Sequence, residues 1–139
     1  MKTTVVTTLM YVGTAIIAFF APIVYAFIFT CILVSVDTIT GVMKAGKESV
    51  SNISSKKAFA VVPKLIFYFL LVIVAHACSL VFEQQLPFVQ LSLIGIGWIE
   101  VKSIDENFSK IFGYSFIDKI MEGAKSVNQI KRHKDDKEL

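Results

Sequence analysis

Three ionisable side chains lie within or beside the long apolar stretches of this chain. Asp37 follows a stretch without charge, His76 lies deep in a second apolar run, and Glu100 follows a third. A charged side chain within a membrane-spanning helix costs about 2.5–3.5 kcal/mol on insertion scales, so it normally faces a protein interior or a water path. These residues could therefore serve an ion path, a proton relay or a contact between helices.

Asp37 is accompanied by Thr40 and Gly41, which follow at i+3 and i+4 and so share its face of a helix. Gly41 and Ala45 form a small-xxx-small pair, a spacing that lets a second helix approach closely. This pattern predicts a contact between helices or between copies of the chain. In the alternative interpretation, Asp37 lies close to the membrane surface, reaches water and only marks the end of the helix.

His76 and Ser79 lie among small residues in the second apolar run. A histidine at this depth could relay protons or bind a metal ion, but no second metal ligand follows at a suitable spacing. We therefore expect a hydrogen-bonded histidine that packs against a neighbouring helix.

Glu100, Ser103 and Asn107 follow one another at i, i+3 and i+7, which places them on a single polar stripe of a helix. Such a stripe can line a water-filled passage or seal one helix against another. It can equally be a solvated face if the helix has left the membrane by that point.

Several functional classes find no support in the sequence. It holds no Ser/His/acid set, no phosphate-binding glycine loop and no cluster of zinc ligands, so we expect neither an enzyme nor a cofactor. The net charge is +3, but no recognised nucleic-acid-binding motif is present. Anionic lipid headgroups explain the basic residues more simply.

Composition indicates that the elements carrying these residues dissolve in lipid. Hydrophobic residues make up 55% of the 139 residues, only 18% are charged, and the mean hydropathy is +0.67. Residues 3–36 contain no charged side chain, and further apolar runs cover residues 65–82 and 86–99. About 20 such residues suffice for a helix to cross a bilayer. The expected fold is all-α, in a polytopic membrane protein.

We predict four transmembrane helices, with three as the alternative, and an amphipathic C-terminal helix. Pro22 divides the first apolar run into helices over about residues 4–20 and 22–44, unless that run forms one kinked helix. Pro63 is expected to kink the entry to a span over residues 64–82. The last span starts near residue 88 and continues as a more polar helix to Gly113, which suits a helix end.

Residues 1–115 are thus expected to form the membrane domain, and residues 116–139 an amphipathic and basic cytoplasmic tail. Apolar residues recur at helical spacing over residues 116–130, as in a helix that lies on a membrane or packs against a neighbour. Residues 131–139 are predicted to be disordered.

The distribution of basic residues predicts the orientation. Lysines crowd residues 44–64 and basic residues recur after residue 99, whereas residues 83–87 contain none. By the positive-inside rule both basic regions face the cytoplasm, and so does the C-terminus. The N-terminus is also inside with four spans and outside with three.

Several short motifs, taken in order, resemble those of a known family. They are Asp37-Thr-Ile-Thr-Gly41-Val-Met-Lys44, Ile53-Ser-Ser55, Pro63-Lys64, Ala75-His76, Ile99-Glu100-x-x-Ser103-Ile104-x-Glu106-Asn107 and Gly113. The chain resembles the phage lysis holins of the toxin-secretion type, the family that includes the clostridial toxin exporter holin. The likeness covers residues 37–116 and depends on the order and spacing of the motifs.

This resemblance implies a multi-pass protein of the bacterial cytoplasmic membrane that assembles into homo-oligomeric holes. Its functional partner would be an endolysin or an exported toxin that crosses through the hole, and no nucleic acid would be involved. The nine polar and small residues singled out above would then make oligomer or pore contacts. The alternative hypothesis is a small channel or transporter subunit that acts with a partner, because buried ionisable groups also suit an ion path.

Overall fold

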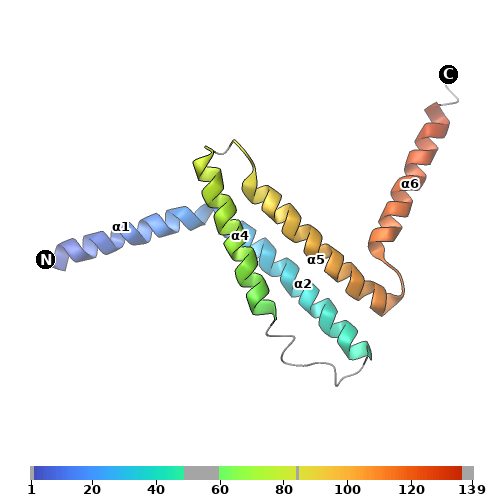
Figure 1. Ribbon diagram of the computed structural model, residues 1–139, viewed down its shortest axis with the longest axis horizontal. Helices are drawn as coiled ribbons and strands as arrows, with labels where there is room; N and C mark the ends of the chain where they lie inside the picture. The colour runs from blue at the N-terminus through green and yellow to red at the C-terminus, as the bar shows by residue number, and fades with distance from the viewer. Residues whose placement is uncertain (1, 49–59, 84, 136–139) are drawn as a thin grey trace.

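The computed structural model describes residues 2–48, 60–83 and 85–135, without the side chains of Lys2, Glu48 and residues 127–135. This part of the chain is helical and contains no strand, which confirms the all-α prediction. In chain order, its elements are α1 (Lys2–Phe20), the short 3-10 helix η1 (Ala21–Ile23), α2 (Val24–Glu48), α4 (Val61–Val81), α5 (Phe88–Phe112) and α6 (Phe116–Asp135). Figure 1 shows their arrangement.

The first apolar run is helical on both sides of Pro22, which is the second residue of η1, the short 3-10 turn between α1 and α2. Because residues 3–47 form one helical stretch across η1, the single kinked helix left open as the alternative fits as well as the two separate helices that we predicted. The bend at η1 contains no reverse turn, so α1 projects away from α2 and does not fold back along it (Figure 1).

Helices α2, α4 and α5 form a three-helix bundle. In Figure 1, α2 and α5 run in the same direction and α4 runs in the opposite direction. α2 packs against both other helices, most extensively against α5. The core is apolar and draws on all three helices and on η1; its buried members are Ile23, Ala26, Val34, Tyr68, Val72 and Ile96.

The start of α4 differs from the prediction. The helix begins at Val61, so Pro63 lies within its first turn, where proline is tolerated. The kink expected at Pro63 stays a prediction, because it depends on the turn before this residue and most of that turn lies outside the described residues.

The end of α5 confirms the prediction for Gly113. This residue caps the helix with a left-handed φ of 83°, and its N–H donates to the Ser109 carbonyl. α6 then continues to Asp135, so the prediction of disorder was wrong for residues 131–135; residues 136–139 lie outside the described part.

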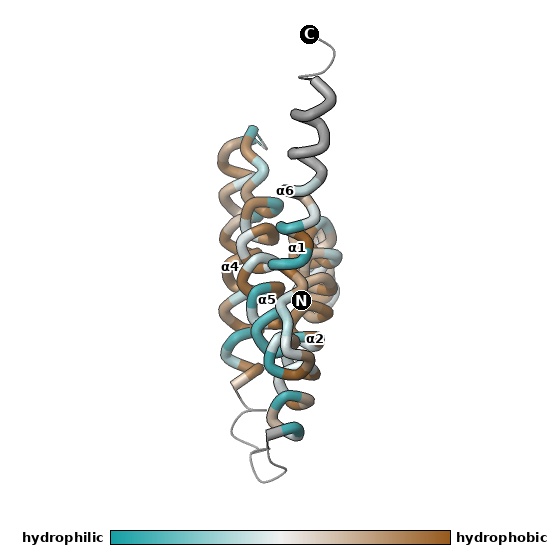
Figure 2. Tube along the Cα trace, turned by 90° about the vertical axis from the view of Figure 1, so that its right-hand side faces the viewer, coloured by the Kyte–Doolittle hydropathy of each residue, from teal (hydrophilic) through white to brown (hydrophobic). Residues whose placement is uncertain are grey.

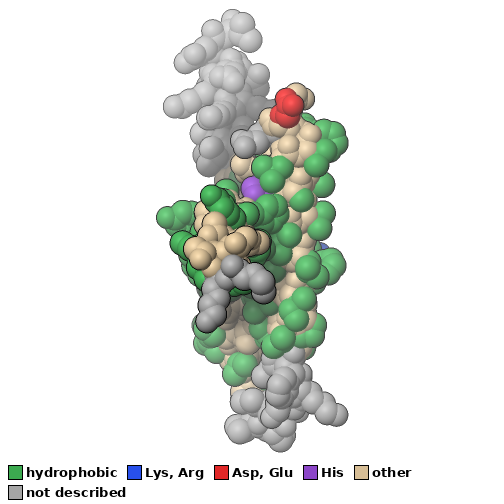
Figure 3. Space-filling model, turned by 90° about the vertical axis from the view of Figure 1, so that its left-hand side faces the viewer, with side chains coloured by type: hydrophobic (Ala, Val, Ile, Leu, Met, Phe, Trp, Pro, Cys, Tyr) green, Lys and Arg blue, Asp and Glu red, His purple; other side chains and the backbone are tan. Residues whose placement is uncertain are grey.

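The outer surface of the bundle is mainly hydrophobic. Hydrophobic residues predominate along α4 in Figure 2, and hydrophobic side chains cover most of the described surface facing the viewer in Figure 3. Two helical stretches, residues 3–47 and 61–81, are long and apolar enough to cross a membrane by length and composition. The predicted number of four spans goes beyond this finding.

Candidate functional site: a buried charge cluster

Charged side chains from all three helices of the bundle meet around Lys64. The Lys64 Nζ atom lies 2.7 Å from Asp37 Oδ2 on α2 and 2.7 Å from Glu100 Oε2 on α5. Lys64 belongs to the first turn of α4, so one ammonium joins three helices. We call Asp37, Lys64 and Glu100 the charge cluster.

Glu100 is the most enclosed member, with a fully buried side chain. The Tyr68 hydroxyl donates to Glu100 Oε1 at 2.5 Å. Among the residues that the structure describes, only the Lys64 ammonium compensates the second oxygen, Oε2. A buried carboxylate is tolerated where a cation and a donor replace water, and this pair does so.

Asp37 is held from a second side by α5. Asn107 Nδ2 donates to Asp37 Oδ1 at 3.3 Å and to the Thr40 hydroxyl at 3.4 Å. Gly41 lies opposite the same amide, because a Cβ added there would stand 3.6 Å from Asn107 Nδ2. At this distance a methyl group would make ordinary van der Waals contact with the amide, so the amide that links α2 to α5 does not require glycine at this position.

The structure thus brings together residues that the sequence placed on separate helices. Asp37 and Thr40 from α2 meet Asn107 from α5, and Glu100 joins them through Lys64. Ala45, further along α2, is buried within the chain, and Ser103 is half-buried on α5. Whether these residues also contact other copies of the chain stays a prediction.

His76 and Ser79 lie apart from the charge cluster, two turns or more further along α4. His76 is buried and packs edge-on against Phe19 of α1, with the ring centroids 5.0 Å apart. The Ser79 hydroxyl donates to the Ala75 carbonyl of its own helix. His76 therefore lies where α4 meets the end of α1.

Sequence reasoning missed Lys64 and Tyr68 as members of the site. Lys64 counted as one of the basic residues that set orientation and as part of the Pro63-Lys64 motif, yet it is also the cation that both carboxylates share. A signal existed, because Tyr68 follows Lys64 at i+4 and so presents a hydroxyl on the same helix face.

The chemistry of the cluster is that of a structural ion pair. The described residues hold no group of three or more His, Cys, Asp or Glu side chains that could bind a metal ion. The ammonium of Lys64 lies where the two carboxylates would otherwise face each other. The cluster therefore ties helices together through charge.

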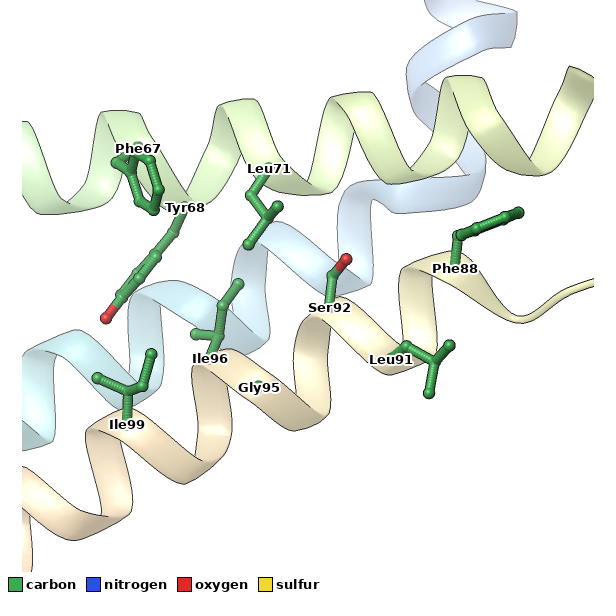
Figure 4. Close-up of a pocket in the computed structure, with 9 residues that line it drawn as sticks. All are labelled: Phe67, Tyr68, Leu71, Phe88, Leu91, Ser92, Gly95, Ile96 and Ile99. Carbon is green, nitrogen blue, oxygen red and sulfur yellow. The ribbon is translucent and has the colours of Figure 1, made fainter.

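An apolar groove of about 400 Å³ lies between α4 and α5 on the outside of the bundle. Figure 4 shows Leu71 of α4 and Phe88, Leu91 and Ile99 of α5 among its lining side chains, with Ser92 a polar exception. Such a surface offers nothing to a polar substrate and suits lipid acyl chains.

The corner between α5 and α6 is fixed by a second buried carboxylate, Asp105. It accepts hydrogen bonds from the Ser115 hydroxyl at 2.7 Å, the Phe116 N–H at 2.8 Å and the Ile117 N–H at 3.3 Å. Asp105 therefore holds the first turn of α6 against the end of α5.

Comparison with known protein families matches residues 14–129 to the bacteriophage holin family. The chain belongs to the bacteriophage holin family. The match includes α2, α4 and α5 entirely, and with them the whole charge cluster. Comparison with curated proteins and with solved structures found no match.

Membership of the holin family places the chain among membrane pore-forming proteins of bacteriophages, not among enzymes. It also agrees with the long apolar helices, and both findings support membrane localisation. The charge cluster of this holin must accordingly be judged as part of a membrane protein, in which an uncompensated charge is costly.

We predict that Tyr68→Phe destabilises this holin by about 1–2 kcal/mol, since Glu100 loses its only hydroxyl donor among the described residues while the ring still packs. Titration with SDS in mixed micelles, followed by Trp98 fluorescence, measures the change. Tyr25→Phe is the matched control, because the Tyr25 side chain is 82% exposed. Equal effects of the two substitutions would contradict the role given to the Tyr68 hydroxyl.

Proposed function

We propose that the chain oligomerises in the bacterial cytoplasmic membrane and opens holes at a set time. Through these holes a cell-wall-degrading endolysin, or an exported toxin, passes to the murein, and the host lyses. The observation that carries the proposal is the match to the bacteriophage holin family over residues 14–129.

The proposed topology has residues 1–115 in the membrane and residues 116–139 in the cytoplasm. α2, α4 and α5 cross the bilayer, and α1 makes a fourth crossing, with three crossings as the alternative. The apolar part of α5, residues 88–99, is only about 18 Å long, against a hydrocarbon core of about 30 Å. If α5 crosses, Glu100 must therefore enter the hydrocarbon region, and its pairing with Lys64 lowers the cost.

The arrangement of polar groups supports a two-stage behaviour. In the single chain Asp37 and Glu100 are both directed at Lys64 and Asn107 is directed at Asp37, while the outer surface is apolar and compatible with lipid. A water-filled hole needs polar lining, so copies that assemble into one must turn part of this inner face toward water. We propose that the oligomer and pore contacts then include Asp37, Thr40, Gly41, Ala45, His76, Ser79, Glu100, Ser103 and Asn107.

Induced expression in a bacterium tests the proposal. Growth should stop abruptly, the membrane potential should collapse, and co-expressed endolysin without its own export signal should then lyse the cells. The controls are a strain that expresses the endolysin alone and one that expresses this chain alone.

Two outcomes would count against holes of this size. Normal growth with the protein present in the inner membrane would contradict the proposal outright. A small, selective conductance that Asp37→Asn alters, without passage of the endolysin, would instead support a channel or transporter subunit.

A further inference from the structure

We infer that α6 is a surface anchor, whose apolar face lies on the anionic lipid surface of the leaflet next to the basic end of the bundle. The inference requires only that the chain resides in a membrane and does not depend on hole formation. The start of α6 is fixed against α5, whereas the apolar face of the rest of the helix is uncovered.

The start of α6 is held in place by several contacts. Asp105 accepts hydrogen bonds from Ser115 and from the first two N–H groups of the helix. The ring of Phe108 on α5 packs edge-on against Phe116, with the centroids 5.9 Å apart. In Figure 1, α6 consequently leaves the end of α5 at a steep angle and does not prolong its axis.

Beyond its first turn, the described apolar face of α6 has no cover from the chain. Ile120 is 66% exposed and Met121 is 53% exposed, although both are large and apolar. Phe112, at the adjoining end of α5, is 54% exposed and extends this uncovered surface toward the bundle. Large apolar side chains gathered in this way mark an interaction surface.

The charges around α6 indicate the occupant. Over residues 116–126, at 3.6 residues per turn, the first charged residue beside the apolar face is Lys125 on one side and Lys119 on the other, while Asp118 and Glu122 lie between the lysines on the far side. Lys125 can lay its stem along an apolar surface and direct its ammonium to headgroup phosphates, and Lys119, whose ammonium lies 4.0 Å from the Tyr114 ring centroid, adds a second positive charge at the opposite edge of this face. An anionic leaflet therefore fits both the apolar and the charged parts of this helix.

The test uses the full-length chain in vesicles at no more than one copy each. In a Cys31→Ala/Cys78→Ala background, an environment-sensitive fluorophore is attached at Ile120→Cys or, as the matched control, at Glu122→Cys. In phosphatidylglycerol vesicles, lipids brominated on the acyl chain should quench the label at position 120 several-fold more strongly than the label at position 122. Aqueous iodide should show the reverse order.

A second arm tests the charge pattern with the label kept at position 120. Lys119→Gln/Lys125→Gln should reduce quenching by the brominated lipid in phosphatidylglycerol vesicles and change it little in phosphatidylcholine vesicles. An equal reduction in both lipids would overturn the assignment to an anionic surface.

Two further outcomes would overturn the inference as a whole. One is equal quenching at positions 120 and 122 in single-copy vesicles. The other is protection of position 120 only when several copies share a vesicle, which would assign the face to a second copy of α6. Because no hole is needed for these signals, a chain that fails to lyse cells can still support the anchor.

Discussion

Lys64→Met should destabilise the three-helix bundle by about 3–5 kcal/mol, because it removes the cation that, among the described residues, compensates two carboxylates. Glu100 is fully buried and would keep only the Tyr68 hydroxyl on one of its oxygens, while Asp37 would keep the Asn107 amide. The Lys64 side chain is 29% exposed, so water can relieve part of this cost and the effect should fall toward the lower end of the range. The midpoint of SDS-induced unfolding in mixed micelles measures the loss.

Two controls separate charge compensation from the loss of a long side chain. Lys102→Met removes an exposed lysine of α5 and should change stability by less than about 0.5 kcal/mol. Adding Glu100→Gln to Lys64→Met should restore part of the lost stability, because the amide has no charge to compensate and still accepts from Tyr68. If Glu100→Gln lowered the stability of the Lys64→Met variant further, charge compensation would not be the role of Lys64.

Ile96→Ala should cost about 2 kcal/mol, the second largest effect that we expect. Ile96 is 1% exposed and belongs to the core that α5 shares with Val34 of α2 and Val72 of α4. In lipid the gain from burying an apolar group is small, but the packing lost around a cavity remains. The same SDS titration should show an earlier transition for this variant.

Ile94→Ala is the matched control for the core substitution. Ile94 lies on the same helix but is 68% exposed, so lipid can fill the space that its side chain leaves. The free energy of unfolding of the Ile94→Ala variant should stay within about 0.5 kcal/mol of that of the parent protein. Equal losses at positions 94 and 96 would mean that α5 does not pack against α2 and α4 in the way described.

Local features of the fold were predictable because their causes are local. Pro22 interrupts a helix through its own ring, and Gly113 ends one because it reaches a left-handed φ without strain. The effect of Pro63 is also local, since it depends on where α4 begins, and the described helix already starts at Val61. The helical continuation to Asp135 was missed because residues 131–135 are polar and carry no apolar periodicity, whereas a helix that has already formed can extend by one hydrogen bond per added residue.

The candidate site was predictable only in part. The cost of placing charge in an apolar run marked Asp37 and Glu100, and the i, i+3, i+7 spacing marked Asn107. Lys64 was not marked, because a lysine near a helix end has the same pattern whether it faces water or a carboxylate. That distinction depends on a contact with residues 27 and 36 positions away along the chain.

The sequence by itself determined that this chain is helical and apolar, since uncharged runs of this length are stable as helices in lipid. It also determined which face of each helix carries polar groups, because the helical period is a property of the backbone. Only the tertiary structure decided that three of these faces meet at one ammonium, and that α1 and α6 project from the bundle. The physical reason is that a pattern along one helix shows what that helix offers, whereas a contact also depends on the helix that packs against it.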